Sequence, residues 1–409
     1  MKHPESTRHG HAATGEAFPP TRSEALARIA AVRPAAYAST RNAIDGAVSR
    51  LSPYLTHGLV TLPEVLAGVT RHHPLDVQHK FVFELGWREY FQHLRTHRGD
   101  GILQSLHPGP LPDEAYAHEL PDDIRRAATG VPVIDEAVRQ LAATGWLHNH
   151  ARMWLASYIV HLRKVHWRTG ADWMFGQLLD GDLASNHLSW QWVAGTGSHK
   201  PYLFNAGNVA RFAPAPWHSR GTAIDTSYEA LEALAASRRS LAAGRGMPTI
   251  DAPALHTEPP HELGFSAPLV EAVIGRDVWL VHPWSLRPPP ADLPDGTVVI
   301  GIALREWHQP WPWTAARWRF VAAAMATLTR ERWHAGAAEV ATALQHARSV
   351  QAVDDLHAGP LLGTLARCRP APLMFRAVAR PCTSFSQWWT QVTRGLKAVH
   401  ELPGLVGSS

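Results

Sequence analysis

The spacing of apolar and polar residues predicts helices along the first half of the chain. Between residues 80 and 96, apolar side chains recur every three or four positions, and Phe81 and Phe91 suit a buried core. The stretch 130–162 has the same spacing, and a turn near Gly145 divides it into two helices. We therefore expect a helical domain in this part of the chain.

The pattern changes in the last third of the chain. Runs rich in β-branched residues at 277–283 and 297–304 predict short, buried parallel strands, and an amphipathic stretch at 314–332 predicts a helix. The predicted fold class is therefore α plus α/β. The expected order is a flexible tail at 1–20, an all-helical domain at 21–225, a linker with a helix at 226–267, a smaller parallel-sheet α/β domain at 268–401 and a tail at 402–409.

Polar and indole side chains gather in the run DGDLASNHLSWQW. Asp180, Asp182 and Asn186 are poor residues for a helix interior, because their side chains compete for nearby backbone groups. Together with Trp190 and Trp192 they suggest a lined cavity. A plainer interpretation is a loop with an N-cap aspartate and two core tryptophans, and the pattern alone leaves both open.

The run SRLSPYL predicts the start of another helix. Ser52 is expected as the N-cap and Pro53 as the first helical residue, a combination that favours helix initiation. Ser49 and Arg50 would then lie beside exposed backbone N–H groups, where an anion can bind. An ordinary capped helix without a ligand explains the same residues.

Two helices carry polar side chains on one side. Glu84, Trp87 and Arg88 share a helix face because they are three and four positions apart. A surface ion pair between Glu84 and Arg88 is the alternative interpretation. Asn149 and Arg152 share a side of their helix in the same way, and solvation alone explains them equally well.

Composition narrows the class of protein. A net charge of +4 and a pI near 9.2 are compatible with a polyanionic partner. Only two cysteines, Cys368 and Cys382, occur, so we expect neither a disulfide framework nor a thiolate-held iron–sulfur cluster, and no metal site. The polar N-terminus and the lack of a long apolar run predict a cytoplasmic protein without a membrane span. The 17 tryptophans favour cofactor stacking or electron transfer.

These motifs resemble those of a known family. DGDLASN at 180–186, WQW at 190–192 and AGTG at 194–197 resemble the flavin-binding core of the DNA photolyase/cryptochrome family. SRLSPYL and the run ELGWRE at 84–89 are similar to two more motifs of that family. The resemblance implies a helical domain that binds FAD in a U-shape.

The resemblance also implies roles for the residues that would surround FAD. Arg152 would pair with Asp180 near the flavin N5 edge, and Asn186 would contact N5. Asp180 and Asp182 would accept hydrogen bonds from the ring and ribityl edge. Electrons would pass through Trp190 and Trp167, and the diphosphate would bind Tyr37, Ser49, Arg50, Leu51 and Ser52.

The implied substrate is UV-damaged DNA. Glu84 would hydrogen-bond the damaged bases, and Trp87 and Trp192 would stack on them. Asn149 and Met153 match the family members that act on cyclobutane dimers, whereas enzymes for the pyrimidine–pyrimidone photoproduct place histidines there.

Three features depart from the family pattern. His150 stands where arginine is frequent, and the segment after Gly197 is altered. No tryptophan stands where the third, surface electron-transfer residue is expected, although Tyr116 is nearby in sequence.

The runs VWLVHPWSLRPPPADL and CTSFSQWWTQVTRGL are weakly similar to the opening and closing of the family's α/β domain, which would then have moved to the C-terminus.

The resemblance implies a light-dependent repair enzyme, a deoxyribodipyrimidine photo-lyase that splits cyclobutane dimers by electron transfer from photoexcited reduced FAD. A cryptochrome-like blue-light receptor without repair activity and a structural protein that has lost flavin are the alternatives. We expect a monomer. Antenna chromophores vary within the family, and the sequence leaves open which one, if any, this chain binds.

Overall fold

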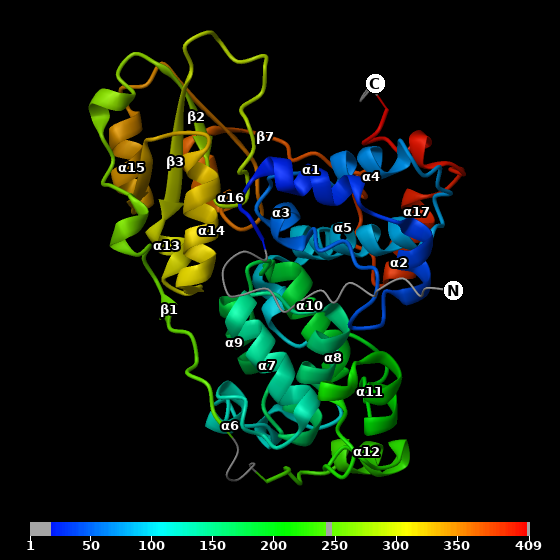
Figure 1. Ribbon diagram of the computed structural model, residues 1–409. Helices are drawn as coiled ribbons and strands as arrows, with labels where there is room; N and C mark the ends of the chain where they lie inside the picture. Colours follow the sequence, from blue (N-terminus) through cyan, green and yellow to red (C-terminus); the bar gives the residue numbers. More distant parts are fainter. Residues whose placement is uncertain (1–17, 243–247, 407–409) are drawn as a thin grey trace, which may run out of the picture.

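The structure is a computed structural model, and it describes residues 18–242 and 248–406. A helical body fills the centre and right of the view, and a small α/β layer lies on its left (Figure 1). The helices of the body are α1 (Arg22–Ala30), α2 (Pro34–Thr40), α3 (Ser52–Thr56), α4 (Leu62–Thr70), α5 (Lys80–Arg98), α6 (Asp122–Arg125), α7 (Pro132–Thr144), α8 (Asn149–Ser157), α9 (Trp167–Gln177), α10 (Leu183–Ala194), α11 (Ala206–Phe212) and α12 (Tyr228–Ala235).

The strongly periodic stretches form the helices that their spacing predicts. The stretch 80–96 lies within α5, and 130–162 contains α7 and α8 followed by a π-helical turn. Gly145 ends α7 in the left-handed region at φ 64°, where a side chain would also meet Leu179. Both predictions are confirmed.

The α/β layer is a five-stranded parallel sheet with the strand order β5-β3-β2-β6-β7. The two β-branched runs form β2 and β3 at its centre, so the predicted parallel strands are confirmed. The strands are β2 (Asp277–Val281), β3 (Val298–Leu304), β5 (Arg332–Ala335), β6 (Ser349–Val353) and β7 (Arg367–Arg369), with a separate β1 (Leu255–His256) and β4 (Trp313–Thr314) pair. The helices are α13 (Arg305–His308), α14 (Ala315–Ala326), α15 (Ala337–Leu344), α16 (Gly359–Leu365) and α17 (Phe385–Val392).

The segment after β7 leaves the sheet and crosses to the helical body. The sequence predicts that this segment belongs to the α/β domain, but α17 packs against α5 on the far side of the molecule from the sheet (Figure 1). Phe385 stacks on Trp87 at 4.0 Å between ring centroids and 10° between planes. Trp389 packs edge-on against Phe83. The apolar face of α17 therefore finds its partner on α5 rather than on the sheet.

Glu89 of α5 holds the C-terminal segment through its backbone. Its carboxylate accepts hydrogen bonds from the N–H groups of Met374 and Phe375, both at 3.0 Å. Burial raises the pKa of Glu89 to about 7, and the two N–H groups only partly offset that rise.

This raised pKa predicts a pH-dependent stability. The folded state binds the Glu89 proton more tightly than the unfolded chain does, so the contribution of Glu89 to stability falls as the pH rises from about 4.5 to about 7. We expect Glu89→Gln to remove this component. The melting temperature of the variant should therefore rise relative to that of wild type as the pH is raised from 5 to 8. A difference that stays constant over this range would contradict the prediction.

The packing of α17 leaves no room for a side chain at Gly86. A Cβ atom there would lie 2.5 Å from Cζ3 of Trp389, whose indole N–H is fixed by Gln78 at 2.8 Å. We expect Gly86→Ala to destabilise the protein by about 1–3 kcal/mol despite the better helix propensity of alanine. The matched control is Gly363→Ala in α16, where the Cβ would meet nothing within 4 Å and should stabilise by about 0.5–1 kcal/mol. Thermal unfolding of both variants measures the contrast, and a stabilising Gly86→Ala would refute it.

One residue of the predicted flexible tail is packed. Phe18 is buried against Tyr54 and Trp146, with ring centroids 6.4 and 5.9 Å away. Burial of this ring removes apolar surface from water and so favours the packed position. The polar composition of residues 1–20 gave no indication of this contact. Residues 1–17 of the expected tail lie outside the described residues.

Candidate functional site

A cavity of about 780 Å³ opens between α5, α8, α10 and the chain around α3. A smaller chamber of about 130 Å³ adjoins it and shares part of its wall, including Ser52, Arg88 and Arg152. All of the predicted site residues except Trp167 line one or both. The residues that line only the larger cavity are Tyr37, Ser49, Arg50, Leu51, Glu84, Trp87 and Trp192. Those that line only the smaller chamber are Asp182, Asn186 and Trp190. Those that line both are Ser52, Asn149, Arg152, Met153 and Asp180.

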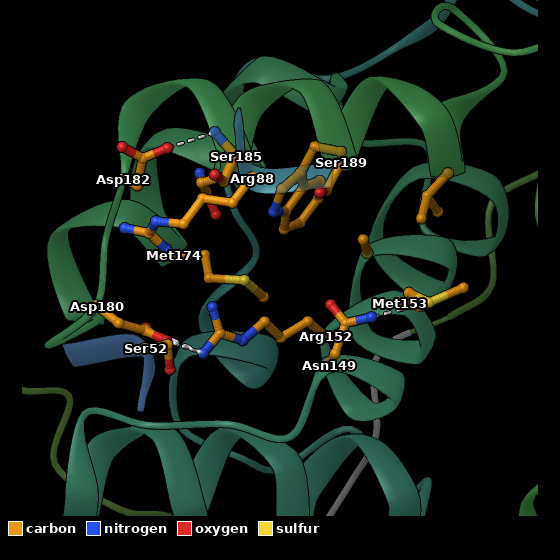
Figure 2. Close-up of a pocket in the computed structure, with 14 residues that line it drawn as sticks. Ser52, Arg88, Asn149, Arg152, Met153, Met174, Asp180, Asp182, Ser185 and Ser189 are labelled. Carbon is orange, nitrogen blue, oxygen red and sulfur yellow. Dashed lines mark hydrogen bonds and ion pairs between the residues drawn. The ribbon is translucent and has the colours of Figure 1, made fainter. Parts of the chain in front are cut away.

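A buried ion pair forms the floor of the smaller chamber. Nη2 of Arg152 donates to both carboxylate oxygens of Asp180, at 2.7 and 2.9 Å (Figure 2). Nε of Arg152 donates to the Leu147 carbonyl at 2.8 Å. The Asp180 side chain is 2% exposed and that of Arg152 is 22% exposed. The guanidinium is therefore held in place with one edge toward the chamber.

Asp182 caps α10. One oxygen accepts from the backbone N–H of Ser185 at 2.7 Å, and the other accepts from Nε2 of Gln92 at 2.7 Å. Burial alone would raise the pKa of Asp182, but the charge of Arg88 and the Ser185 hydrogen bonds bring that pKa below its ordinary value. Asp182 therefore stays ionised and supports the first turn of α10.

The two tryptophans of the WQW run face different spaces. Two residues along a helix point about 200° apart, so Trp190 is buried in the wall of the smaller chamber while Trp192 is 40% exposed at the larger cavity. Gly170 permits this position of Trp190, because a Cβ there would lie 2.4 Å from the indole. Trp167, one turn before Gly170 on α9, is buried and donates its indole N–H to Ser105 at 2.9 Å.

Asn186 turns one end of its amide away from the chamber. Its Nδ2 donates to the Ala171 carbonyl at 2.9 Å, so its oxygen is the atom left for a ligand in the smaller chamber.

Glu84 is held by cations other than the one that the sequence suggested. Arg41 contacts its carboxylate at 3.3 Å and Lys80 at 2.9 Å, whereas Arg88 donates to the Thr56 hydroxyl at 2.7 Å. The alternative of a Glu84–Arg88 surface pair is therefore wrong.

The predicted cap at SRLSPYL is also wrong in detail. Leu51 is the N-cap of α3 and Ser52 is its first helical residue, and Arg50 just before them adopts a left-handed backbone with φ 51°. Ser52 Oγ instead accepts from the indole of Trp146 at 3.2 Å. The Arg50 guanidinium lies 4.7 Å from the centre of the same indole. A strained backbone beside a cavity is a frequent mark of a functional position.

Several lining residues escaped the sequence analysis. His150, noted there as a departure, bonds the Asn42 carbonyl at 2.7 Å and the Tyr202 hydroxyl at 3.1 Å. Nothing in their local sequence marks Asn42 or Tyr202, because only the fold brings them to α8. Other lining residues of this kind are Arg41, Phe91, Trp146, Leu147, His148, Asn208 and Phe212.

Within residues 18–242 and 248–406, no group of three or more histidine, cysteine, aspartate or glutamate side chains could hold a metal ion. In that same part of the chain, each helix is too short or too polar to cross a membrane.

Comparisons with known proteins match the part of the chain that carries the cavity. Residues 81–229 match the family described as the FAD binding domain of DNA photolyase. A deoxyribodipyrimidine photo-lyase from Streptomyces griseus is 39% identical over 152 residues, which is 37% of this chain and 33% of that protein. A cryptochrome DASH from Gloeobacter violaceus is 33% identical over 173 residues, which is 40% of this chain and 34% of that protein. The chain thus spans about a third of the length of these curated relatives.

Among solved structures, a cryptochrome from Synechocystis sp. superposes with a TM-score of 0.43 at 25% identity, covering 51% of this chain and 46% of that one. The matched residues 81–229 include the DGDLASN and WQW runs on the cavity wall. Over residues 81–229, this chain is therefore similar to the FAD-binding domain of DNA photolyases.

Proposed function

We propose that this protein binds FAD in the two adjoining chambers and repairs cyclobutane pyrimidine dimers in UV-damaged DNA under blue light. The proposal is carried by one observation. Glu84, Trp87, Asn149, Met153 and Trp192, each expected to meet the damaged bases, line the same cavity, and that cavity also contains the Arg152–Asp180 pair.

The residues present fit FAD. The larger cavity has the volume of a typical cofactor pocket, and the smaller chamber next to it is walled by an indole, an amide and an ion pair. Arg50 and Arg41 supply positive charge along the larger cavity, where a diphosphate could lie. When bound and reduced, FAD would supply the light-excited electron that splits the dimer.

The protein's own contribution to this chemistry is positioning. Asn186 would present its amide oxygen to the N5 edge, and Arg152 would present a guanidinium held by Asp180. Trp190 would close the chamber against water. These groups are fixed before any ligand arrives, so little reorganisation is needed when FAD binds.

The damaged dinucleotide would have to leave the duplex, as in other enzymes that act on a base and in photolyases in particular. Trp192 is an exposed indole at the cavity and offers a stacking surface that accepts any base. Glu84 would exchange Arg41 or Lys80 for a base edge, and the released cation could then meet a phosphate.

Repair can be tested directly on the purified protein. FAD-loaded and photoreduced protein is illuminated with blue light in the presence of an oligonucleotide that contains one cyclobutane dimer, and restored pyrimidines are measured by chromatography. We expect repair in the light and none in the dark. A stable flavoprotein that repairs nothing would overturn the proposal.

A cryptochrome-like receptor without repair is the second candidate. It is favoured by the contacts that already occupy two substrate-side residues: Glu84 is paired with Arg41 and Lys80, and one face of Trp87 is covered by Phe385. This candidate predicts flavin photoreduction with equal affinity for damaged and intact DNA. A strong preference for damaged DNA would exclude it.

A further inference from the structure

The crevice where a doubly wound sheet usually binds its ligand is filled here by the protein itself. That crevice lies at the carboxyl ends of the strands where the strand order reverses, which in this sheet is between β2 and β6. His282 follows β2 and its Nε2 lies 2.9 Å from the Val353 carbonyl of β6. His357, four residues after β6, is 6% exposed and lies at the same end of the sheet.

The ring of His357 is fixed in orientation. Nδ1 lies 2.7 Å from Oδ1 of Asp355, and an ionised carboxylate can only accept, so this nitrogen carries the proton. The ring is stacked flat on Trp284, at 4.7 Å and 4° between planes, and it meets the edge of Trp307 at 5.3 Å. A hydrogen bond and two indoles therefore leave the ring little freedom to turn.

The other ring nitrogen reaches into the helical body. Burial lowers the pKa of His357 despite the nearby Asp355, so the ring is neutral and its Nε2 is an acceptor. This Nε2 accepts the backbone N–H of Leu183, the first residue of α10, at 3.2 Å and lies 3.5 Å from Oδ2 of Asp182. It thus satisfies an N–H group at the helix start that has no partner within the helix.

The first turn of α10 is connected to the chamber by sequence. Asn186 and Trp190 follow Leu183 by three and seven positions, and both line the smaller chamber. Asp182 lines it as well. Because α10 is a continuous helix, a shift of its first turn moves all three side chains relative to a ligand.

We propose that His357 is a positioning residue for the flavin site, contributed by the α/β domain. Oriented by Asp355, it fixes the start of α10 and thereby the placement of Asn186 and Trp190. This inference rests on the proposed binding of FAD. It extends the site past residue 229 into the α/β domain, since an FAD-binding domain that ended there would lose this contact.

The test measures FAD affinity of the flavin-free protein by quenching of flavin fluorescence. His357→Phe keeps the ring stack but removes the acceptor, and we expect it to raise the dissociation constant for FAD about tenfold. His357→Gln can place its carbonyl oxygen near the Leu183 N–H, so we expect recovery to within about threefold of wild type. The matched control is His308→Phe, which removes a buried histidine of the same domain that contacts Trp313 and Trp318 instead.

A second variant keeps the inference testable if His357→Phe folds poorly. Asp355→Asn frees the ring without removing it, and we expect it to weaken FAD binding in the same direction. The double variant of Asp355→Asn and His357→Phe should bind FAD no more weakly than His357→Phe alone, because both act through one contact.

The possible outcomes distinguish a failure of this inference from a failure of the proposed FAD binding. If wild type binds FAD and His357→Phe binds it equally well, the inference is overturned while FAD binding stands. If His308→Phe weakens binding as much as His357→Phe, the effect is general loss of structure and the inference is likewise overturned. If wild type itself binds no FAD, the proposed function fails first.

Discussion

Arg152→Met is expected to lower the free energy of unfolding by about 3 kcal/mol and to abolish FAD binding. The variant leaves the almost fully buried Asp180 carboxyl group without its two charge-assisted hydrogen bonds, and removing one partner of a buried ion pair is strongly destabilising. The same substitution removes the cation at the flavin chamber. Urea unfolding followed by tryptophan fluorescence measures the first effect, and flavin absorbance after reconstitution measures the second.

The control for this prediction is an exposed ion pair in the same chain. Arg305 and Glu339 are 3.3 Å apart with side chains 40% and 55% exposed, so Arg305→Met should change stability by less than about 1 kcal/mol. Similar losses of unfolding free energy in Arg152→Met and Arg305→Met would contradict the prediction that the buried pair contributes more to stability than the exposed pair.

Trp192→Ala is expected to weaken binding to dimer-containing single-stranded DNA about tenfold while leaving FAD binding intact. Trp192 combines exposure with a place on the cavity wall and lies 5.7 Å from Tyr202, so its loss removes stacking surface without opening the core. Stacking of one base on an aromatic side chain contributes about 1–3 kcal/mol. Fluorescence anisotropy with damaged and intact oligonucleotides at fixed salt measures the change.

The matched control is Trp173→Ala. Trp173 lies on α9, packs against a hydrophobic cluster and is not among the residues that line the two chambers, so its loss should lower the melting temperature without changing DNA affinity. An unchanged preference for damaged DNA in Trp192→Ala would remove this residue from the substrate site.

The parts of the fold that the sequence predicts are those governed by local rules. The apolar spacing of α5 and the turn at Gly145 depend on neighbouring residues, and both are present as expected. The composition of the DGDLASN and WQW runs likewise pointed to a cavity wall, which α10 provides. Short-range pattern was therefore sufficient for these helices, whereas the individual site residues were predicted from the family resemblance.

What the sequence does not reveal depends on contacts between distant residues. Glu89 meets Met374 across 285 positions, and Leu183 meets His357 across 174. Apolar spacing predicts that α17 has an apolar face to bury. It does not predict which surface that face will pack against, so the contact with Trp87 could not be anticipated. The left-handed Arg50 is a similar case, because nothing in the residue pattern of SRLSPYL marks its positive φ angle.

The packing of α17 on α5 also has a consequence for biosynthesis. A ribosome completes α5 almost 300 residues before it completes α17, so the newly made helical body emerges with Phe83 and the outer face of Trp87 still in contact with water. Uncovered aromatic surface of this kind favours aggregation and attracts chaperones. Translation of the final segment therefore provides the residues that cover this aromatic surface of α5. Truncated chains that end before Phe385 should be recovered mainly as insoluble material.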